Sequence, residues 1–127
     1  MPILTREGET HGTTVDEKIY ADIEQTVVRL GWLSQRQLMQ LLDHKRFRLT
    51  LPQFYSLQAL HDMAGQCKMS TLAERTNQSA ASLTGVVDRL IEKRLVSRTR
   101  HEPDRRQVMV EMTEQGARML TEIQQAH

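Results

Sequence analysis

The feature that most restricts the fold is a change in the spacing of apolar residues near position 94. Before it, five apolar residues fall at positions i, i+3, i+4, i+7 and i+8 and so share one helix face. They are Leu83, Val86, Val87, Leu90 and Ile91. After Arg94 the period changes to two in the runs 96–100 and 107–112, on either side of a Pro-Asp turn. In the first run Val96, Arg98 and Arg100 alternate with Ser97 and Thr99, and in the second Val108, Val110 and Met112 alternate with Gln107, Met109 and Glu111. This pattern predicts an amphipathic helix that leads directly into a β-hairpin.

Other helices are expected before and after this unit. The segment 70–76 predicts a short helix, and the polar turn 76–78 with the candidate cap Ser79 joins it to the longer one, which is the outline of a helix-turn-helix. Thr50, Pro52 and Gln53 predict the start of a helix that runs to about residue 64, followed by a short extended link at 66–69. Thr113 is the expected cap of a last helix.

The N-terminal part shows a second apolar stripe, from about residue 16 to residue 42. Gly31 interrupts it and is a candidate for a bend or a break. The predicted fold is mainly α: a winged helix-turn-helix, with a three-helix core and a two-stranded β wing, flanked by N- and C-terminal helices. The predicted divisions are a flexible arm (1–14), an N-terminal helical segment (15–48), the winged helix-turn-helix (49–112) and a C-terminal helix (113–127).

Composition excludes several classes of protein. Aromatic residues make up only 4% of the chain, so the core is expected to be aliphatic. There is no long apolar run and no secretory signal pattern, so neither a membrane span nor export is expected. A single cysteine, Cys67, fits a cytoplasmic protein. The histidines are scattered and no phosphate-binding loop or nucleophile–base pattern is present, so we expect no enzyme, no metal and no cofactor.

Charge is unevenly distributed although the net charge is only +1. Residues 44–106 carry 12 Lys/Arg against 6 Asp/Glu, a local charge of +6, whereas the rest of the chain is acidic. A basic middle between acidic flanks is typical of a nucleic-acid-binding face, although chance clustering of solvated charges gives the same count.

Five sequence fragments in order make the interpretation more specific. They are Leu72-Ala73-Glu74-Arg75, Val87-Asp88-Arg89-Leu90, Leu95-Val96-Ser97-Arg98, Asp104-Arg105-Arg106 and Val110-Glu111-Met112-Thr113-Glu114-Gln115-Gly116. Together they resemble the MarR family of winged-helix transcriptional regulators over roughly residues 45–120. The chain departs from the family pattern at Arg94, where a glycine is usual, and at Gly85, where a polar or basic residue is usual. It also has only 11 residues after Gly116. In the family the N-terminal helix and a longer C-terminal helix build the dimer, so the resemblance implies that 15–48 is a dimerisation segment and that the dimerisation helix at 113–127 is shortened.

The resemblance implies that the helix 79–93 reads the major groove of double-stranded DNA. Its candidate contacts are the residues off the apolar stripe together with the cap: Ser79, Ala81, Ser82, Thr84, Gly85 and Arg89. Small side chains dominate this set, so part of the specificity is expected to come from DNA shape. For Ser79 the alternative is a cap and nothing more, and for Ser82 and Thr84 it is a solvated helix face.

The resemblance also implies that the wing, 97–108, reaches the minor groove. There Arg106 would enter the groove while Asp104 holds its guanidinium, and the alternative is a structural pair that only stiffens the hairpin. Further wing candidates are Arg98, Arg100 and Arg105, and candidate backbone contacts are Ser70, Thr71 and Arg75.

Two further features remain open at the level of sequence. A small-molecule effector is common in the family, and Tyr20, Trp32, His44 and Phe54 are candidates to line its pocket, with burial in the core as the alternative. Cys67 is either an inert buried thiol or a redox sensor. The sequence therefore predicts a sequence-specific DNA-binding transcriptional regulator, most simply a homodimeric repressor. The alternative is a winged helix that binds another protein and no DNA.

Overall fold

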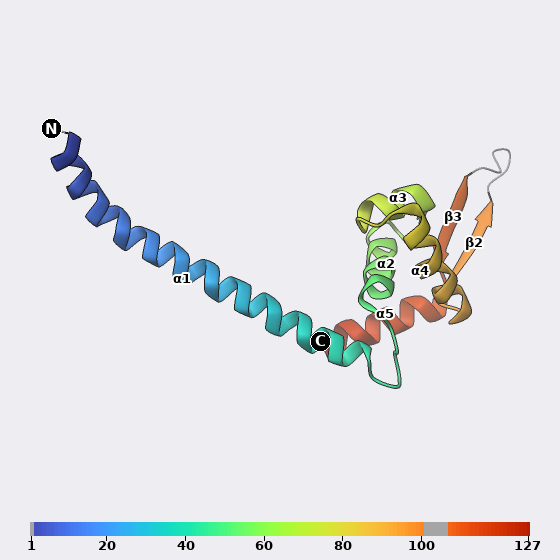
Figure 1. Cartoon of the computed structure of the whole chain (residues 1–127). Helices are drawn as coiled ribbons and strands as arrows, with labels where there is room; N and C mark the ends of the chain where they lie inside the picture. The colour runs from blue at the N-terminus through green and yellow to red at the C-terminus, as the bar shows by residue number, and fades with distance from the viewer. Residues whose placement is uncertain (1, 101–106) are drawn as a thin grey trace. The chain divides into compact units, whose positions relative to one another are not determined.

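The computed structural model describes residues 2–100 and 107–127, and side chains from residue 14 onward within the first helix. The elements in order are α1 (Pro2–Leu42), α2 (Leu51–Asp62), β1 (Gln66–Lys68), α3 (Met69–Arg75), α4 (Ala80–Glu92), β2 (Val96–Arg100), β3 (Val108–Met112) and α5 (Glu114–Ala126) (Figure 1). They form two units, Met1–Gln37 and Leu38–His127. The first unit is part of α1, and the second contains every other element.

The N-terminal segment differs from the expected flexible arm, because residues 2–14 belong to α1. The helix also continues through Gly31, where a bend or break was a candidate. Poor helix formers can be included in this way because extending an existing helix adds a hydrogen bond for each residue that is ordered. A glycine in the interior costs only about 1 kcal/mol relative to alanine.

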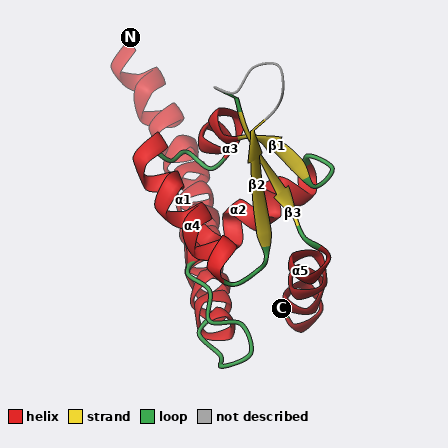
Figure 2. Cartoon of the chain, turned by 90° about the vertical axis from the view of Figure 1, so that its right-hand side faces the viewer, coloured by secondary structure: helices red, strands yellow, loops and turns green. Residues whose placement is uncertain are grey.

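The C-terminal unit encloses an aliphatic core, as composition predicted. Its largest fully buried side chains are mainly leucines from α2, α3, α4 and α5: Leu57, Leu60, Leu72, Leu83, Leu90 and Leu120. Figure 2 shows α2 and α4 beside the sheet, with α5 following β3. The apolar stripe of α4 accounts for its buried residues, since Leu83, Val87 and Leu90 all face this core.

Helix starts were predictable from local chemistry. The backbone N–H of Gln53 donates to Thr50 Oγ1 (3.3 Å) and the backbone N–H of Thr50 donates to Gln53 Oε1 (3.2 Å), which confirms the capping box of α2. Thr113 caps α5 by accepting from the N–H of Gly116 (3.0 Å). These side chains satisfy backbone groups that a helix end leaves without partners.

The sheet has one strand more than the predicted wing. β1 lies in the segment expected to be a simple extended link, and it pairs antiparallel with β3, so the strand order is β1-β3-β2. Residues 109–111 of β3 pair on both sides; the central one, Val110, lies opposite Cys67 of β1 and Arg98 of β2. A run of three residues carries too little pattern to predict strand pairing, which depends here on where β3 lies.

Helix α5 packs within the C-terminal unit through its apolar face. Leu120 and Ile123 are buried, and Gln124 Nε2 donates to Gln58 Oε1 of α2 (2.9 Å). At its start Gly116 approaches the backbone so closely that a Cβ there would lie 2.1 Å from the carbonyl oxygen of Leu95. The segment predicted as a dimerisation helix is therefore fastened to its own unit.

Candidate nucleic-acid interface

The helix-turn-helix consists of α3, a four-residue connection (76–79) and α4. Asn77 in the turn adopts a left-handed conformation (φ 53°), which asparagine accepts more readily than most residues. Gln78 Nε2 donates to Thr76 Oγ1 (2.9 Å) and to Ser56 Oγ of α2 (3.3 Å), so the turn is tied to the helix beneath it. This fixes the start of α4 relative to the core.

The residues predicted to read DNA on α4 all lie on its exposed face. They are Ser79, Ala81, Ser82, Thr84, Gly85 and Arg89. Ser79 caps the helix, because its Oγ accepts from the N–H of Ser82 (3.1 Å), and Thr84 Oγ1 donates to the carbonyl of Ala80 (2.9 Å). Both hydroxyls keep further hydrogen-bonding capacity. The structure thus presents a polar face made of small side chains, and base contact by these residues stays a prediction.

The wing side chains divide between described and undescribed positions. Arg98 and Arg100 extend from β2 and are exposed, whereas Asp104, Arg105 and Arg106 lie outside the described residues. Arg98 has a partner that the sequence did not reveal: its Nη1 lies 3.0 Å from Oδ1 of Asp88 on α4. The wing and the candidate recognition helix are therefore joined by an ion pair.

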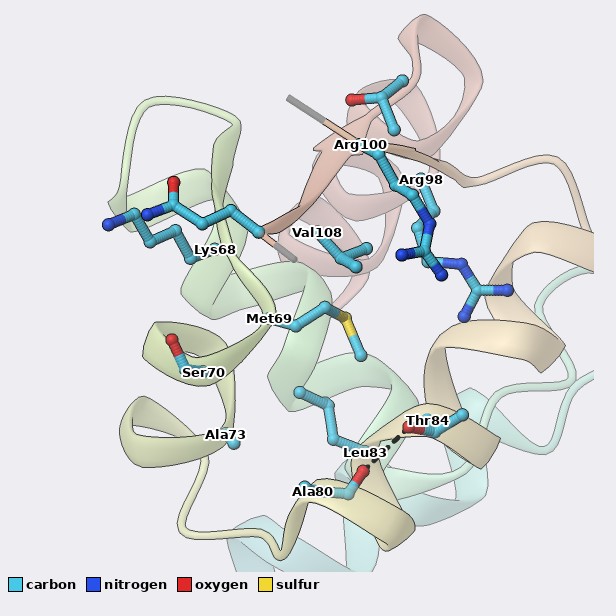
Figure 3. A pocket seen from close by; sticks show the side chains of 12 residues that line it. Lys68, Met69, Ser70, Ala73, Ala80, Leu83, Thr84, Arg98, Arg100 and Val108 are labelled. Atoms are coloured by element: carbon cyan, nitrogen blue, oxygen red, sulfur yellow. Dashed lines mark hydrogen bonds between the residues drawn. The ribbon is translucent and has the colours of Figure 1, made fainter. Parts of the chain in front are cut away.

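A groove of about 740 Å³ opens between the start of α3, α4 and the wing strands (Figure 3). Three cationic residues line it, Lys68, Arg98 and Arg100, while Met69 and Val108 supply apolar surface. Sequence reasoning missed Lys68 as a site residue because it lies in a short extended segment with no motif. It is the last residue of β1, pairs with Met109 of β3, and lines the groove across from Arg98 and Arg100 (Figure 3).

The three predicted backbone contacts on α3 differ in their surroundings. Ser70 is exposed and lines the groove, Arg75 is exposed, and Thr71 is half-buried. Ser70 is thus the member of this set that the structure brings together with the cationic groove residues.

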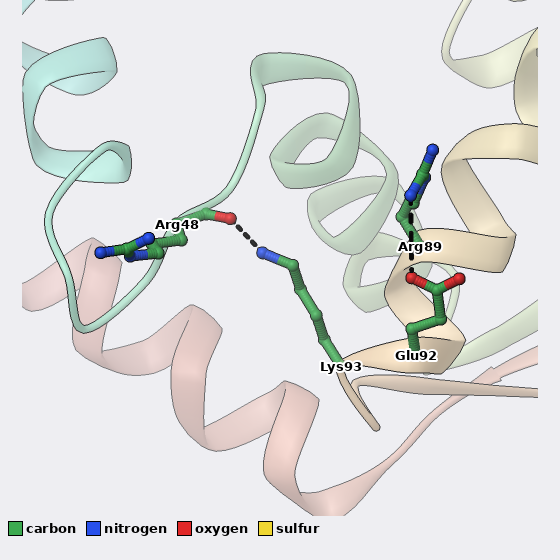
Figure 4. A network of polar contacts seen from close by, with 4 residues as sticks. All are labelled: Arg48, Arg89, Glu92 and Lys93. Carbon is green, nitrogen blue, oxygen red and sulfur yellow. Dashed lines mark hydrogen bonds and ion pairs between the residues drawn. The ribbon is translucent and has the colours of Figure 1, made fainter.

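One contact ties the C-terminal end of α4 to the loop that precedes α2: Lys93 Nζ donates to the backbone carbonyl of Arg48 (Figure 4). A second contact lies within α4, where Arg89 Nη1 is 3.9 Å from Glu92 Oε2. Burial, and secondarily the positive charge of Arg48, lower the pKa of Lys93 below its usual range. Arg94, which stands where the family usually has glycine, is indeed left-handed (φ 62°).

The four predicted effector residues are not equivalent. Phe54 is in the hydrophobic core, which is the alternative weighed for it, and its ring lies 5.9 Å from that of Tyr55. His44 is exposed, and its Nδ1 accepts from the N–H of Arg46 (3.2 Å). Tyr20 and Trp32 are 67% and 71% exposed on α1, so core packing does not account for them. An effector site stays a prediction.

The described residues give little support for a redox thiol, a metal site or a membrane span. Cys67 is buried, and burial raises the pKa of its thiol although the charge of Arg75 acts in the opposite direction, which favours an inert thiol. Among the side chains that the structure describes, those of 14–100 and 107–127, no three from His, Cys, Asp or Glu gather as metal ligands would. None of the helices described there has the length and apolarity needed to cross a bilayer.

Known proteins resemble this chain in sequence and in fold. Residues 49–107 match the model of the MarR family. An HTH-type transcriptional regulator of Bacillus subtilis, YfiV, is 31% identical over 89% of this chain and 72% of its own length. The repressor NicR of Pseudomonas putida is 40% identical over 58% of this chain and 46% of its own length.

A solved structure is similar over most of the chain. AbsC, a MarR family transcriptional regulator from Streptomyces coelicolor, has a TM-score of 0.69 and 30% identity, over 81% of this chain and 69% of that one. Identity at this level over two-thirds or more of a relative's length, together with a common fold, indicates common descent. The chain therefore belongs to the MarR family of winged helix-turn-helix proteins and is a DNA-binding transcriptional regulator.

Proposed function

We propose that the protein binds double-stranded DNA as a homodimer, with α4 in the major groove and the wing at the minor groove, and that it represses transcription by occupying a promoter. The observation that carries the proposal is the groove that Lys68, Arg98 and Arg100 line together with Thr84 of α4. Positive side chains gathered beside a protruding helix are what a DNA backbone requires.

Contacts to bases would come from the first half of α4. Ser82 and Thr84 can hydrogen-bond to base edges or phosphates, and Ala81 can contact a thymine methyl group. Gly85 has no Cβ, and the space beside it is open, since an added Cβ would meet no described heavy atom within 4 Å. The helix backbone could therefore approach the DNA closely at this position. Such a surface offers few bidentate contacts, so shape and deformability of the duplex would supply part of the specificity.

Contacts to the backbone and minor groove would come from the wing and from Ser70. Arg100 is the last residue of β2, and Asp104, Arg105 and Arg106 follow it in the sequence, outside the described residues. Arginine suits this position because a narrow minor groove concentrates negative potential. Lys68, at the opposite side of the groove, would neutralise a phosphate.

The partner in the dimer would be a second copy that covers α1. Five large apolar side chains at three- and four-residue spacing along this helix are exposed: Val15, Ile19, Ile23, Val27 and Leu30. An apolar stripe of this length is rarely left in water. A symmetric dimer presents two recognition helices to two half-sites, so the expected DNA site is pseudo-palindromic.

Titration into random-sequence duplex DNA at two salt concentrations tests DNA binding by this face. Arg100→Ala removes one groove cation, so it should weaken binding and reduce the slope of log affinity against log salt by about 0.9. Arg118→Ala on the exposed side of α5 removes an equal charge elsewhere and is the matched control.

The outcomes of this titration distinguish the two candidate functions. A larger loss with Arg100→Ala than with Arg118→Ala supports the proposed face. Equal effects would reject it, and the absence of wild-type binding at low salt would favour the protein-binding alternative, because an adaptor makes no phosphate contacts.

A further inference from the structure

Asp88 is an acidic residue on the helix that we assign to the major groove. It follows the buried Val87 and precedes the exposed Arg89. Because DNA carries a negative charge on every phosphate, a carboxylate at this position opposes binding unless a cation neutralises it. The role of Asp88 is therefore not direct attraction to the backbone.

The neutralising cation comes from the wing. Arg98 Nη1 lies 3.0 Å from Asp88 Oδ1, and the side chains of Arg98 and Asp88 are 37% and 47% exposed. Ion pairs that remain this accessible to water contribute little to folding stability. A contribution to folding stability is thus a weak explanation for the Asp88–Arg98 pair. Its position between the two elements that we assign to DNA contact is a stronger one.

The pair also changes the charge of the groove. Lys68, Arg98 and Arg100 line it, and none of the described lining residues is acidic. Asp88 faces one of these three cations from α4. In the free protein it therefore withholds part of the positive charge that the groove would otherwise offer to any phosphate.

We propose that Asp88 is a specificity-determining residue that holds the Arg98 guanidinium against α4 and thereby limits binding to non-cognate duplex DNA. This inference rests on the proposed function of α4 and the wing. An arbitrary duplex must compete with Asp88 for Arg98, so it loses one phosphate contact. A guanidinium has several N–H donors in one plane, so a duplex that places an acceptor in that plane can bind Arg98 without displacing Asp88.

A double-mutant cycle with random-sequence duplex DNA tests the inference. Asp88→Asn keeps the shape of the side chain and removes its charge, so affinity at about 50 mM salt should rise on the order of 3- to 10-fold and the salt slope should steepen by about 0.9. Arg98→Gln should change affinity by less than about twofold in the wild type but should abolish the whole gain in the Asp88→Asn background.

Glu92→Gln is the matched control, because it removes the same charge from the same helix. Glu92 lies beside Arg89 at 3.9 Å, with both side chains 69% exposed. Its effect should be additive with that of Arg98→Gln. Asp88→Glu retains the charge and should bind as the wild type does, and thermal melting followed by circular dichroism establishes that each variant is folded at the assay temperature.

Three results would overturn the inference. A gain with Asp88→Asn that persists after Arg98→Gln means that Asp88 acts through its charge alone. Weaker binding by Asp88→Asn means that the pair assists binding to arbitrary DNA. A wild type that does not bind random duplex at low salt rejects the proposed function together with this inference, whereas the first two results leave DNA binding by α4 and the wing intact.

Discussion

The two units of the chain use the same kind of apolar pattern with opposite results. Leu90 of α4 is 0% exposed, whereas Leu30 of α1 is 61% exposed, although both belong to stripes with helical spacing. In the unit Leu38–His127 the stripes of α2, α4 and α5 cover one another. Along α1 before residue 34, the apolar side chains Val15, Ile19, Ile23, Val27 and Leu30 remain exposed.

This difference shows that amphipathic spacing predicts a buried face but not what buries it. Within the C-terminal unit, short connections bring the stripes together in one chain. The stripe of α1 has no such cover among the described residues of its own unit, which supports the proposal that a second copy provides it. The following predictions test this contrast, beginning with the largest expected effect.

Truncation of the same residue type should separate the two units most clearly. Leu90→Ala should lower the free energy of unfolding of the C-terminal unit by about 2–5 kcal/mol, because it removes fully buried methyl groups and leaves a cavity. Leu30→Ala should change it by less than about 0.5 kcal/mol, as exposed substitutions generally do. Urea denaturation followed by far-UV circular dichroism, at a concentration where the protein is monomeric, measures both. Similar losses would contradict the contrast.

Glycines in the two units should also respond oppositely to alanine. Gly116→Ala should destabilise the protein by about 1–3 kcal/mol, since its Cβ would lie 2.1 Å from the carbonyl oxygen of Leu95. Gly31→Ala should instead stabilise α1 by roughly 0.5–1 kcal/mol, because alanine restricts the unfolded chain and favours helix. Thermal melting of both variants checks the signs. Stabilisation by Gly116→Ala would mean that α5 is not packed against Leu95.

A charge on the stripe of α1 should affect assembly and not folding of the C-terminal unit. Ile23→Glu would place a carboxylate in the proposed dimer interface, raising the dissociation constant of the dimer on the order of 10- to 100-fold. Gln25→Glu adds the same charge to a polar position of the same helix and is the control. Sedimentation over a concentration series measures the effect. Equal behaviour of the two variants would place the dimer interface elsewhere.

The end of α4 offers a smaller test of how far local sequence preferences are overridden. Arg94 has a left-handed backbone (φ 62°), which costs a non-glycine residue about 1 kcal/mol. Arg94→Gly should therefore stabilise the C-terminal unit by up to about 1 kcal/mol, offset in part by the greater freedom of glycine in the unfolded chain. Arg118→Gly, within α5, should be destabilising. A loss of stability with Arg94→Gly would show that this side chain makes a compensating contact.

The smallest expected effect is a pH dependence at Lys93. Its pKa is lowered in the folded protein by burial and by Arg48, so the unfolded chain binds more protons just below the usual lysine pKa. The free energy of unfolding should therefore gain a component that rises with pH in that interval, and Lys93→Gln should remove it. Denaturation at about pH 8 and about pH 10 measures the difference between wild type and variant. Identical pH dependences would contradict the cause assigned to the shift.

Features that depend on neighbouring residues were predicted well. The capping box at Thr50 and Gln53, the cap at Thr113 and the helix after Ser79 all follow from short-range hydrogen bonds and spacing, and all are present. The exposed face of α4 was predicted for the same reason, because a helical period assigns each side chain to a face. Residues 2–14 continue α1 where a flexible arm (1–14) was expected, since glycine and threonine lower helix propensity without forbidding a helix.

Features that depend on distant residues were not predicted. The ion pair of Asp88 with Arg98 joins a helix to a strand, and Lys93 reaches a carbonyl 45 positions earlier in the chain. The strand β1 exists because β3 lies beside it. None of these contacts leaves a periodic signal in the sequence. The ion pair and the Lys93 hydrogen bond involve one residue on each side, and β1 is only three residues long.

The sequence by itself determined the order of the elements, their caps and the apolar face of each helix, because these follow from interactions within a few residues. Tertiary structure decided which stripes are covered, which cations meet in the groove and which carboxylate restrains Arg98. Those outcomes depend on how the backbone brings together residues that are far apart in sequence, and the hydrophobic effect that drives this is non-directional. The apolar stripe of α1 is as regular in sequence as that of α4. Only the stripe of α4 is covered within its own unit.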